Sequence, residues 1–409
     1  MRILSLSSVY PNPVEPELGL FVRSRLTALA ELAEVRVIAP VPLLDYSNPR
    51  GKLWRKPVAG LRSHDQGIEV YHPRWLFPPN GMPVNVAFQF GRLLPLVQRI
   101  RREFDFDLID AHFCYPEGVT AALLSAVYHR PFAVTLRGSE LTFDRYRPRR
   151  AVMRWAIRRA DAVIAVAEPL RQFAVSRGAA PERTVSIPNG IDARVFFPRD
   201  RRAIRRELGV ESYRKVILST GELIEAKGHQ LVVKALQGLL KVGLDAEVWI
   251  AGGTARGGPQ FEQTLRGMIR EWGLESRVKL LGWVHRDRLP ELLSAADIFC
   301  LASYSEGWPN VVLEALACGT PVVATRVGGV PEMIVDPSFG TVVPPRDATA
   351  LENALAAALQ REWDCALISR WGRSRTWSRV AREVLDVFER IVSDPAPTNR
   401  EQSFLRHFR

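Results

Sequence analysis

The chain has 409 residues, 47% of them hydrophobic and 24% charged, which is the composition of a soluble globular protein with more than one domain. The sequence contains no stretch of eighteen apolar residues and no paired spacing of its four cysteines, which argues against a transmembrane helix, a disulfide framework and a zinc site. The net charge of +12 is uneven, because residues 1–190 contain 26 Lys and Arg against 17 Asp and Glu (+9), whereas residues 191–409 contain 30 against 27 (+3).

The first half of the chain alternates apolar, strand-like segments with helical patterns. Apolar residues recur at helical spacing in residues 18–32, and the opening MRILSLSSVYPNP is too short and too polar for a signal peptide. We therefore expect a cytoplasmic protein. Strand-like segments occur at residues 2–8, 35–40, 106–112, 132–138, 162–167 and 184–188.

Gly19 lies where the first helix is predicted to begin. A glycine there lets a ligand approach the backbone, and the free amides of a helix start attract anions. The surrounding residues do not form the G-x-G-x-x-G fingerprint of dinucleotide-binding proteins, so a plain turn glycine is an equally good interpretation.

Seven arginines fall within residues 145–159, among them Arg147, Arg149, Arg150 and Arg154. A basic surface of this kind suits nucleic acid, anionic lipid or an acidic substrate. A solvated helix face is an equally good interpretation. Aromatic residues are not interleaved with these arginines at a spacing that stacks bases, so nucleic acid is the least favoured partner.

A domain junction is predicted at residues 188–208, where two prolines, a glycine and a run of charges interrupt the alternation. The alternation of strands and helices predicts an α/β protein with two doubly wound parallel sheets in tandem. Ligands of such sheets bind at the carboxyl ends of the strands, so we expect the site in a cleft between the two domains. Strand-like segments resume at residues 215–220, 246–252, 277–282, 297–303 and 321–325.

Residues 219–230, STGELIEAKGHQ, follow the first strand of the second half. Gly221 turns the chain, and Lys227 lies just before the next helix, where a lysine is well placed to meet phosphate. A lone lysine is more often a surface residue, so this signal is weak by itself.

The most informative stretch is SEGWPNVVLEALACG, residues 305–319. Pro309 marks a helix start, so the amides of residues 308–311 are expected to form an anion site. Glu306 lies in the preceding loop, and Glu314 lies in the second helical turn with apolar residues on nearly every side. A carboxylate in that setting can accept hydrogen bonds from paired hydroxyls such as those of a ribose. Compensation of the helix dipole is the weaker interpretation.

The chain is predicted to be helical after about residue 361, with an apolar stripe that includes Val380, Val384 and Phe388. We place the first domain at residues 1–188, the second at 189–365, a C-terminal helix at 366–392 and a polar tail at 393–409.

Taken together, these segments resemble glycosyltransferase family 4 over nearly the whole chain. The family implies retaining transfer from a nucleotide-activated sugar and a GT-B fold, in which two tandem Rossmann-like domains flank a cleft. It also implies that the final helix returns to the first domain. The resemblance rests on Glu306-x7-Glu314 with its flanks LGWVHRDRLPELLSAADIFCLAS and ALACGTPVVATRVGGVPEMI, and on GELIEAKGHQLVVKAL, YPNPVEPELGLFVRSRLTALAE, HFCYPEGVTAALL, TLRGSEL and SIPNGIDARVFFP.

The resemblance also implies roles for individual residues. Glu314 would bind the ribose hydroxyls, Glu306 the donor sugar and Lys227 the diphosphate. The backbone of residues 282–285, which include Val284 and His285, would hold the base. His112 would lie on the acceptor side. The other donor-site residues implied are Gly19, Arg137, Gly221, Glu222, Gly307, Trp308, Pro309, Asn310 and Val311.

Two positions depart from the family's pattern. Glu222 stands where the family commonly has arginine, and Arg137 stands where it commonly has histidine. A carboxylate beside a diphosphate is repulsive, so we expect Arg137 to restore the missing positive charge across the cleft. The other interpretation is that Glu222 turns outward and Arg137 meets only Glu140.

The sequence therefore predicts a glycosyltransferase that moves a sugar from a nucleotide diphosphate donor to a lipid-linked or envelope glycan, without a metal or other cofactor. We expect it in the cytoplasm, peripheral on the inner face of the cytoplasmic membrane, where its basic first half would meet anionic lipid. Two alternatives stay open: a catalytically weak nucleotide-sugar-binding scaffold at the membrane, and another GT-B activity such as an epimerase.

Overall fold

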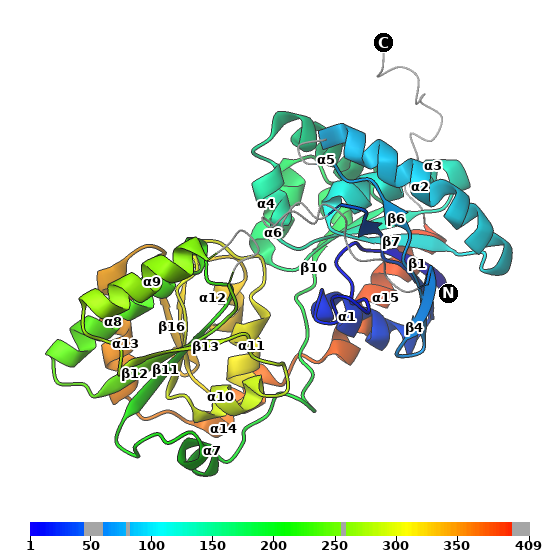
Figure 1. Cartoon of the computed structure of the whole chain (residues 1–409). Coiled ribbons are helices and arrows are strands. Elements are labelled where there is room, and N and C mark those ends of the chain that lie inside the picture. Colours follow the sequence, from blue (N-terminus) through cyan, green and yellow to red (C-terminus); the bar gives the residue numbers. More distant parts are fainter. Residues whose placement is uncertain (45–59, 79–81, 255–258, 395–409) are drawn as a thin grey trace. The chain divides into compact units, whose positions relative to one another are not determined.

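The computed structural model describes residues 1–44, 60–78, 82–254 and 259–394, so most of the predicted polar tail lies outside the described residues. The chain divides into two compact units (Figure 1). One unit comprises Met1–Asn189 with Trp377–Arg409, and the other comprises Gly190–Thr376. The division between Asn189 and Gly190 falls within the predicted junction.

The first unit is built on a sheet that, within the described residues, has eight strands in the order β10-β9-β8-β7-β1-β2-β5-β4. Neighbouring strands are parallel except for β4, which pairs antiparallel with β5 at the edge. This edge hairpin is not among the predicted strands, because β4 carries the polar sequence RSHD and so lacks an apolar period of two. The strands are β1 Arg2–Leu6, β2 Glu34–Ile38, β4 Arg62–Asp65, β5 Ile68–Tyr71, β7 Leu108–His112, β8 Phe132–Leu136, β9 Ala162–Ala165 and β10 Thr184–Ser186, and β3 Val41–Pro42 pairs separately with β6 Arg74–Trp75.

Helices cover both faces of this sheet. Successive strand residues point to opposite faces, so that Ile3 joins the core beneath α1 and α15, whereas Leu4 joins the core beneath α2, α3 and α5. The helices of the unit are α1 Leu20–Ala30, α2 Met82–Glu103, α3 Val119–Tyr128, α4 Ser139–Phe143, α5 Arg147–Arg159, α6 Glu168–Ser176 and α15 Trp377–Ser393.

The last helix, α15, packs beside α1 and so belongs to the first unit although it ends the described chain (Figure 1). The single C-terminal helix predicted at 366–392 is wrong in its start, because α14 (Cys365–Gly372) belongs to the second unit and α15 begins only at Trp377. A Cβ at Gly372 would collide with the backbone at Ala317, so a glycine lets α14 lie directly against α11 (Asn310–Ala317).

The second unit holds a parallel sheet that, in the part of the chain described, has six strands in the order β13-β12-β11-β14-β15-β16. The edge strand β16 is not among the predicted strands, since its sequence GTVV begins with a glycine and is only four residues long. The strands are β11 Lys215–Thr220, β12 Ala246–Ala251, β13 Val278–Gly282, β14 Ile298–Leu301, β15 Val322–Thr325 and β16 Gly340–Val343. The remaining helices are α7 Arg201–Glu207, α8 His229–Lys241, α9 Gln260–Glu271, α10 Leu289–Ala295, α12 Val330–Met333 and α13 Ala348–Gln360.

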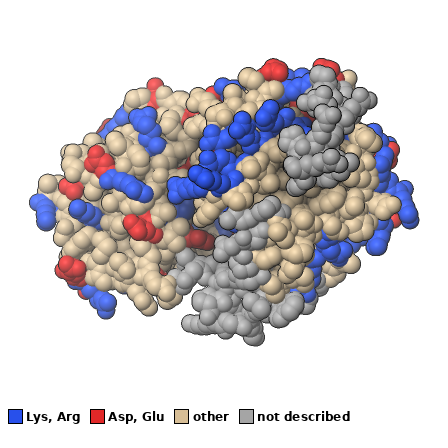
Figure 2. All heavy atoms as spheres, turned by 90° about the horizontal axis from the view of Figure 1, so that it is seen from above, with Lys and Arg blue, Asp and Glu red and all other residues tan. Residues whose placement is uncertain are grey.

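The surface charge follows the sequence. Figure 2 looks down on the molecule from the side on which α5 lies in Figure 1, and it shows a group of Lys and Arg side chains with few acidic ones among them. Within the ranges that the structure describes, we find no helix with both the length and the apolar character needed to cross a bilayer.

Candidate functional site

Two predicted donor-site residues of the second unit meet at the carboxyl ends of neighbouring strands. Lys227 ends a short 3-10 turn (Glu225–Lys227) that follows β11, and Glu306 lies in the loop that follows β14. Because β11 and β14 are adjacent and parallel, both loops emerge at the same edge of the sheet. Lys227 Nζ donates a hydrogen bond to Glu306 Oε1 at 2.7 Å, and the two side chains are 27% and 14% exposed.

Backbone packing holds these two loops together. Gly228 has a φ of 71°, and a Cβ there would collide with the carbonyl oxygen of Ala302, so only glycine lets the chain cross the end of β14. The N–H of Tyr304 donates to the carbonyl of Ala226 at 2.8 Å. The positions of Lys227 and Glu306 are therefore set by main-chain contacts on both sides of the ion pair.

His229, the first residue of α8, braces the turn at Gly221 and is missing from the predicted site. Its Nε2 faces the carbonyl of Gly221 at 3.3 Å, and its Nδ1 faces Ser219 Oγ at 3.1 Å. A carbonyl only accepts, so Nε2 carries the proton and Nδ1 accepts from the serine. Burial lowers the pKa of His229 to about 4, which keeps the ring neutral at physiological pH. No feature of the sequence besides its place after a glycine marks this histidine.

Glu314 has a carboxylate that is largely buried and yet has no hydrogen-bond partner among the described residues. It lies on α11 between the buried residues Leu313 and Ala315, and it is only partly exposed itself. Burial raises the pKa of the carboxyl to about 7, while the charge of Arg286 opposes the shift. Within the described residues its side chain accepts no hydrogen bond, so it is available to hydroxyl donors.

The segment that precedes α11 is fixed by its neighbours. Trp308 is buried, and the N–H of Gly329 donates to the carbonyl of Gly307 at 2.8 Å. Pro309 is the residue just before the helix, and the N–H of Val312 already bonds back to the Pro309 carbonyl. Since Pro309 has no N–H, the predicted anion site can use only the amides of its neighbours.

The predicted base-binding segment follows β13. Val284 is partly buried and His285 is exposed, and the His285 ring contacts the ring of Trp283 edge-on at 5.7 Å. Trp283 is 63% exposed. Trp283 lies within the predicted base-binding segment, but the prediction assigns the base contact to the backbone and gives the tryptophan side chain no role.

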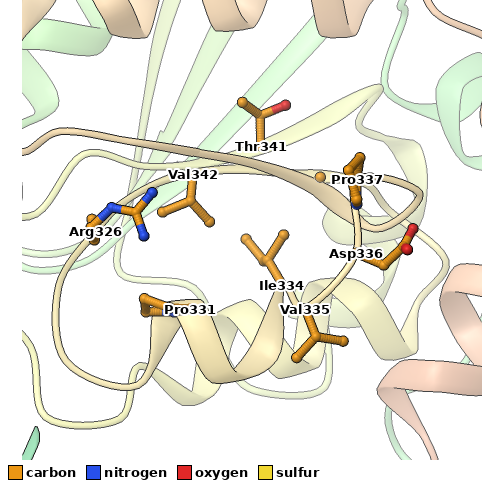
Figure 3. A pocket seen from close by; sticks show the side chains of 9 residues that line it. Arg326, Pro331, Ile334, Val335, Asp336, Pro337, Thr341 and Val342 are labelled. Carbon is orange, nitrogen blue, oxygen red and sulfur yellow. The ribbon is translucent and has the colours of Figure 1, made fainter.

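A separate hollow of about 570 Å³ lies against edge strand β16 and helix α12 (Figure 3). It is lined by residues between Arg326 and Val342, among them Ile334, Val335 and Asp336. None of the predicted donor-site residues lines it, so it is distinct from the Lys227–Glu306 pair.

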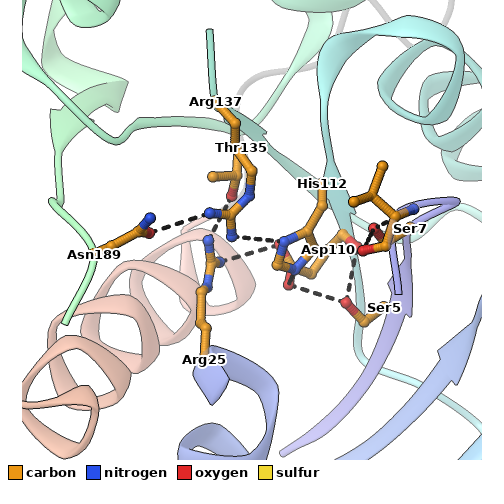
Figure 4. A network of polar contacts seen from close by, with 9 residues as sticks. Ser5, Ser7, Arg25, Asp110, His112, Thr135, Arg137 and Asn189 are labelled. Atoms are coloured by element: carbon orange, nitrogen blue, oxygen red, sulfur yellow. Dashed lines mark hydrogen bonds and ion pairs between the residues drawn. The ribbon is translucent and has the colours of Figure 1, made fainter. Parts of the chain in front are cut away.

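In the first unit, the ends of β7 and β8 carry a buried network of charged side chains (Figure 4). Arg137 donates from Nη2 to His112 Nδ1 at 2.8 Å and from Nη1 to Asn189 Oδ1 at 3.1 Å. Asp110 Oδ2 lies 3.0 Å from His112 Nε2, and Asp110 Oδ1 lies 3.3 Å from Nη2 of Arg25. Side chains from α1, from the ends of β7 and β8, and from the domain junction therefore meet in one buried cluster.

The partners of His112 determine its protonation. Arginine only donates, so Nδ1 must accept and the ring proton lies on Nε2, where it is donated to Asp110. Burial lowers the pKa of His112 to about 4. Both ring nitrogens are occupied and the side chain is fully buried. In the described structure this histidine therefore orients Arg137 and Asp110, and its place on the acceptor side stays a prediction.

Asp110 and Arg25 form the second half of the network. Burial opposes ionisation of Asp110, but Arg25 and His112 beside it hold its pKa well below the usual range. Nη1 of Arg25 also donates to Thr135 Oγ1 at 2.7 Å. Arg25 was missed in the sequence, because an arginine on a helix is normally assigned to the solvent face.

The two positions that depart from the family's pattern have different surroundings. Glu222 is exposed, as the second interpretation of its role expected. Arg137 is 9% exposed and committed to His112 and Asn189. The second interpretation expected Glu140 to be the partner of the Arg137 side chain. Glu140 instead accepts from the backbone N–H of Arg137, and the guanidinium has other partners. Compensation between Arg137 and Glu222 stays a prediction.

Gly19 has a local explanation. Its φ is 68°, and a Cβ would collide with the carbonyl oxygen of Val9, so the chain's own backbone requires glycine at the start of α1. This accounts for the residue without a ligand, and a role in donor binding stays a prediction.

Comparison with known proteins links both halves of the chain to glycosyltransferases. Residues 20–195 match the model described as Glycosyltransferase Family 4, and residues 200–375 match Glycosyl transferases group 1. The putative teichuronic acid biosynthesis glycosyltransferase TuaC of Bacillus subtilis (strain 168) is 30% identical over 373 residues, which cover 87% of this chain and 88% of that protein. The D-inositol 3-phosphate glycosyltransferase of Corynebacterium glutamicum (strain R) is 30% identical over 295 residues, covering 68% and 69%.

Solved structures share the fold. Sucrose-phosphate synthase from Thermosynechococcus elongatus aligns with a TM-score of 0.77 and 20% identity, over 96% of this chain and all of that one. Anabaena Alr3699/HepE in complex with UDP and glucose aligns with a TM-score of 0.73 and 21% identity, over 95% and 99% of the two chains. At these identities the likeness concerns the fold alone.

Proposed function

This chain belongs to glycosyltransferase family 4 and has the GT-B fold expected from its sequence, and we propose that it is a retaining enzyme of envelope glycan synthesis. In this proposal it moves a sugar from a nucleotide diphosphate donor to a glycan or lipid-linked acceptor.

The observation that carries the donor assignment is the contact between Lys227 and Glu306 at the carboxyl end of the second sheet. A fixed cation there lies where negative charge would develop on a leaving diphosphate, and such preorganised charge stabilises a transition state. Donor binding would release Glu306 from the lysine, so that the carboxylate orients the sugar hydroxyls. Glu314, whose carboxylate is unpaired in the described structure, would accept from the ribose hydroxyls.

The transfer itself exchanges one bond for another at the anomeric carbon. The bond from that carbon to the phosphate oxygen breaks, and a bond to the acceptor's hydroxyl oxygen forms on the same face of the sugar. The hydroxyl proton passes to the leaving phosphate oxygen. In this scheme Lys227 stabilises the charge on the leaving group, and we expect turnover to persist when divalent cations are chelated.

The acceptor assignment draws on the relative from Bacillus subtilis, whose name places it in teichuronic acid biosynthesis. That relative covers most of both chains, which supports an anionic envelope polysaccharide or its lipid-linked precursor as the acceptor here. Similarity of fold by itself would not support an assignment of the acceptor.

A thermal-shift panel of UDP, GDP and ADP tests the donor assignment. A ligand at about 100 times its Kd raises the free energy of unfolding by about 2.7 kcal/mol, so the correct base should stand out. The corresponding nucleotide sugars are then assayed for hydrolysis and transfer, with and without EDTA, and the anomeric configuration of the product is read by NMR.

Three results would reject the proposal in different ways. Binding without hydrolysis or transfer would favour a nucleotide-sugar-binding scaffold. Conversion of the donor to an isomeric sugar would favour an epimerase. An inverted linkage in the product would refute retention while leaving the transferase intact.

A further inference from the structure

A stripe of arginines follows one face of α5 in the first unit. Arg147, Arg150, Arg154 and Arg158 succeed one another at spacings of three and four residues, which places them on one side of the helix, and all four are exposed. We call these residues the arginine stripe. The helix has the sequence RPRRAVMRWAIRR and contains no acidic residue.

Little negative charge offsets the arginine stripe. Asp144 lies beside it, but its carboxylate is bound to Arg177 at 2.7 Å and is 3.8 Å from Arg150. Within the described part of the chain, the other three members of the stripe form no ion pair. The stripe therefore presents uncompensated positive charge to solvent.

Arg149, which was predicted to belong to a membrane-binding patch, has another role. Its guanidinium lies over the rings of Tyr115, Phe143 and Tyr146 at 5.4, 5.1 and 5.2 Å, and its side chain is partly buried. These contacts hold α5 against the preceding turn. Arg149 therefore packs beneath the exposed arginines and is not part of the arginine stripe. Arg158, which was not in the predicted patch, belongs to the stripe.

Apolar side chains lie on the elements next to the stripe. Helix α2 packs against α5 and exposes Val84 (50%) and Phe88 (40%), which are one helical turn apart. Leu141 (37%) and Tyr146 (48%) are exposed just before α5 begins. We call these four residues the apolar flank.

We infer that the arginine stripe and the apolar flank together dock the first unit on an anionic bilayer surface. The stripe by itself would suit any polyanion. Exposed aliphatic and aromatic side chains beside basic ones favour the interface of a membrane, where the apolar groups insert and the cations meet phosphate headgroups. This inference does not depend on the donor, the acceptor or the mechanism, and it adds a binding surface to the proposed function.

The test measures binding of the full chain to vesicles by co-sedimentation. Vesicles contain phosphatidylcholine with phosphatidylglycerol, or phosphatidylcholine alone. The variant Arg147→Gln/Arg154→Gln/Arg158→Gln removes three stripe members that have no ion pair among the described residues. Each juxtamembrane charge contributes about five-fold to affinity, so we expect a loss of roughly 100-fold at low salt.

A matched control removes three exposed arginines of the second unit. Arg202→Gln/Arg206→Gln/Arg270→Gln changes the net charge equally, and we expect binding within about three-fold of the unaltered chain. For the apolar flank, Val84→Ser/Phe88→Ser should reduce the binding that persists at high salt, whereas Val242→Ser, an exposed valine of the second unit, should not.

A selective loss in the stripe variant on anionic vesicles supports the inference. Equal losses in the stripe and control variants, equal binding to both kinds of vesicle, or binding to single-stranded DNA but not to vesicles would overturn it. Thermal midpoints establish that the variants are folded. If the triple variant is not, the three single substitutions are compared, and unchanged binding in all three also counts against the inference.

Discussion

The charged cluster at the strand ends of the first unit and the one at the strand ends of the second differ in burial and in pairing. In the first, Asp110 and His112 are fully buried and tied to Arg25 and Arg137. In the second, the Lys227–Glu306 pair is partly open to solvent, and Glu314 accepts no hydrogen bond from the residues that the structure describes.

The difference follows from the cost of burying charge. A buried ion loses its hydration, so it persists only when other charges and hydrogen bonds replace the lost water. In the first network each charged group has such partners, although Nε of Arg25 and Nε of Arg137 have none among the described residues. The network fixes the ends of β7 and β8. A partly exposed pair keeps access to water and can exchange its partner for a ligand. This contrast assigns stability to the first network and chemistry to the second.

The largest effect is expected from a substitution that breaks the buried network of the first unit. Arg25→Met leaves Asp110 buried without its arginine, and we expect the free energy of unfolding to fall by about 3–5 kcal/mol in urea titrations. Arg99→Ala, an exposed arginine on α2, should change it by less than about 0.5 kcal/mol. Arg25→Met/Asp110→Leu should recover part of the loss. An Arg25→Met protein as stable as the unaltered chain would show that the network does not stabilise the fold.

The next effect concerns catalysis. Lys227→Ala should lower kcat by roughly 100- to 1000-fold, as the removal of a preorganised charge at a leaving group does elsewhere. Its effect on unfolding should stay within about 1 kcal/mol, because the pair with Glu306 is partly exposed. The control Lys234→Ala alters an exposed lysine of α8 and should retain full turnover. Steady-state transfer assays measure kcat for both variants. An unchanged kcat for Lys227→Ala would exclude Lys227 from the mechanism.

A pH effect tests the buried carboxyl of the first unit. Burial raises the pKa of Glu117 from 4.5 to about 7, and Ser8 donates its N–H to Oε1 at 3.2 Å. The folded state therefore binds this proton more tightly than the unfolded chain does. Protonation of Glu117 therefore adds about 3 kcal/mol to the free energy of unfolding. This contribution is fully present below pH 4.5 and is lost as the pH rises through 7.

Glu117→Gln removes this titration. We expect the stability of the variant, measured from pH 5 to 8, to fall less steeply than that of the unaltered chain, with the two curves closest at low pH. Parallel curves over this range would contradict the shift. Glu182→Gln, on the surface of the same unit, serves as the comparison.

The smallest effect concerns Glu314. Its carboxyl has a pKa raised to about 7 by burial, so the carboxylate that accepts from hydroxyls forms mainly above that pH. Affinity for the nucleotide should therefore rise by up to about ten-fold between pH 6 and pH 8. Glu314→Gln should bind about ten-fold more weakly at pH 8 and lose this pH dependence. Calorimetric titration measures the nucleotide affinity of both proteins at each pH. The phosphate of the nucleotide ionises equally in both experiments, so the difference between the proteins reports on Glu314 alone. If the affinity of the two proteins had the same pH dependence, Glu314 would not belong to the site.

Much of the second unit's site was predictable. The spacing of Glu306 and Glu314, the helix start at Pro309 and the lysine before α8 are local patterns, and parallel strands bring successive loops to one edge of a sheet. The network of the first unit was largely hidden. Arg25 lies 85 residues from Asp110 in sequence, and an amphipathic pattern by itself assigns an arginine to solvent.

The sequence by itself determined two doubly wound sheets, the helices that cover them and the family, because apolar periodicity and turn residues act over short distances. Tertiary structure decided which charges are buried and paired. Only the folded chain shows that His112 is held by Arg137 and Asp110, that Arg149 lies against aromatic rings while its neighbours are exposed, and that α15 packs beside α1. These features depend on contacts between segments far apart in sequence, and such contacts leave no local pattern to read.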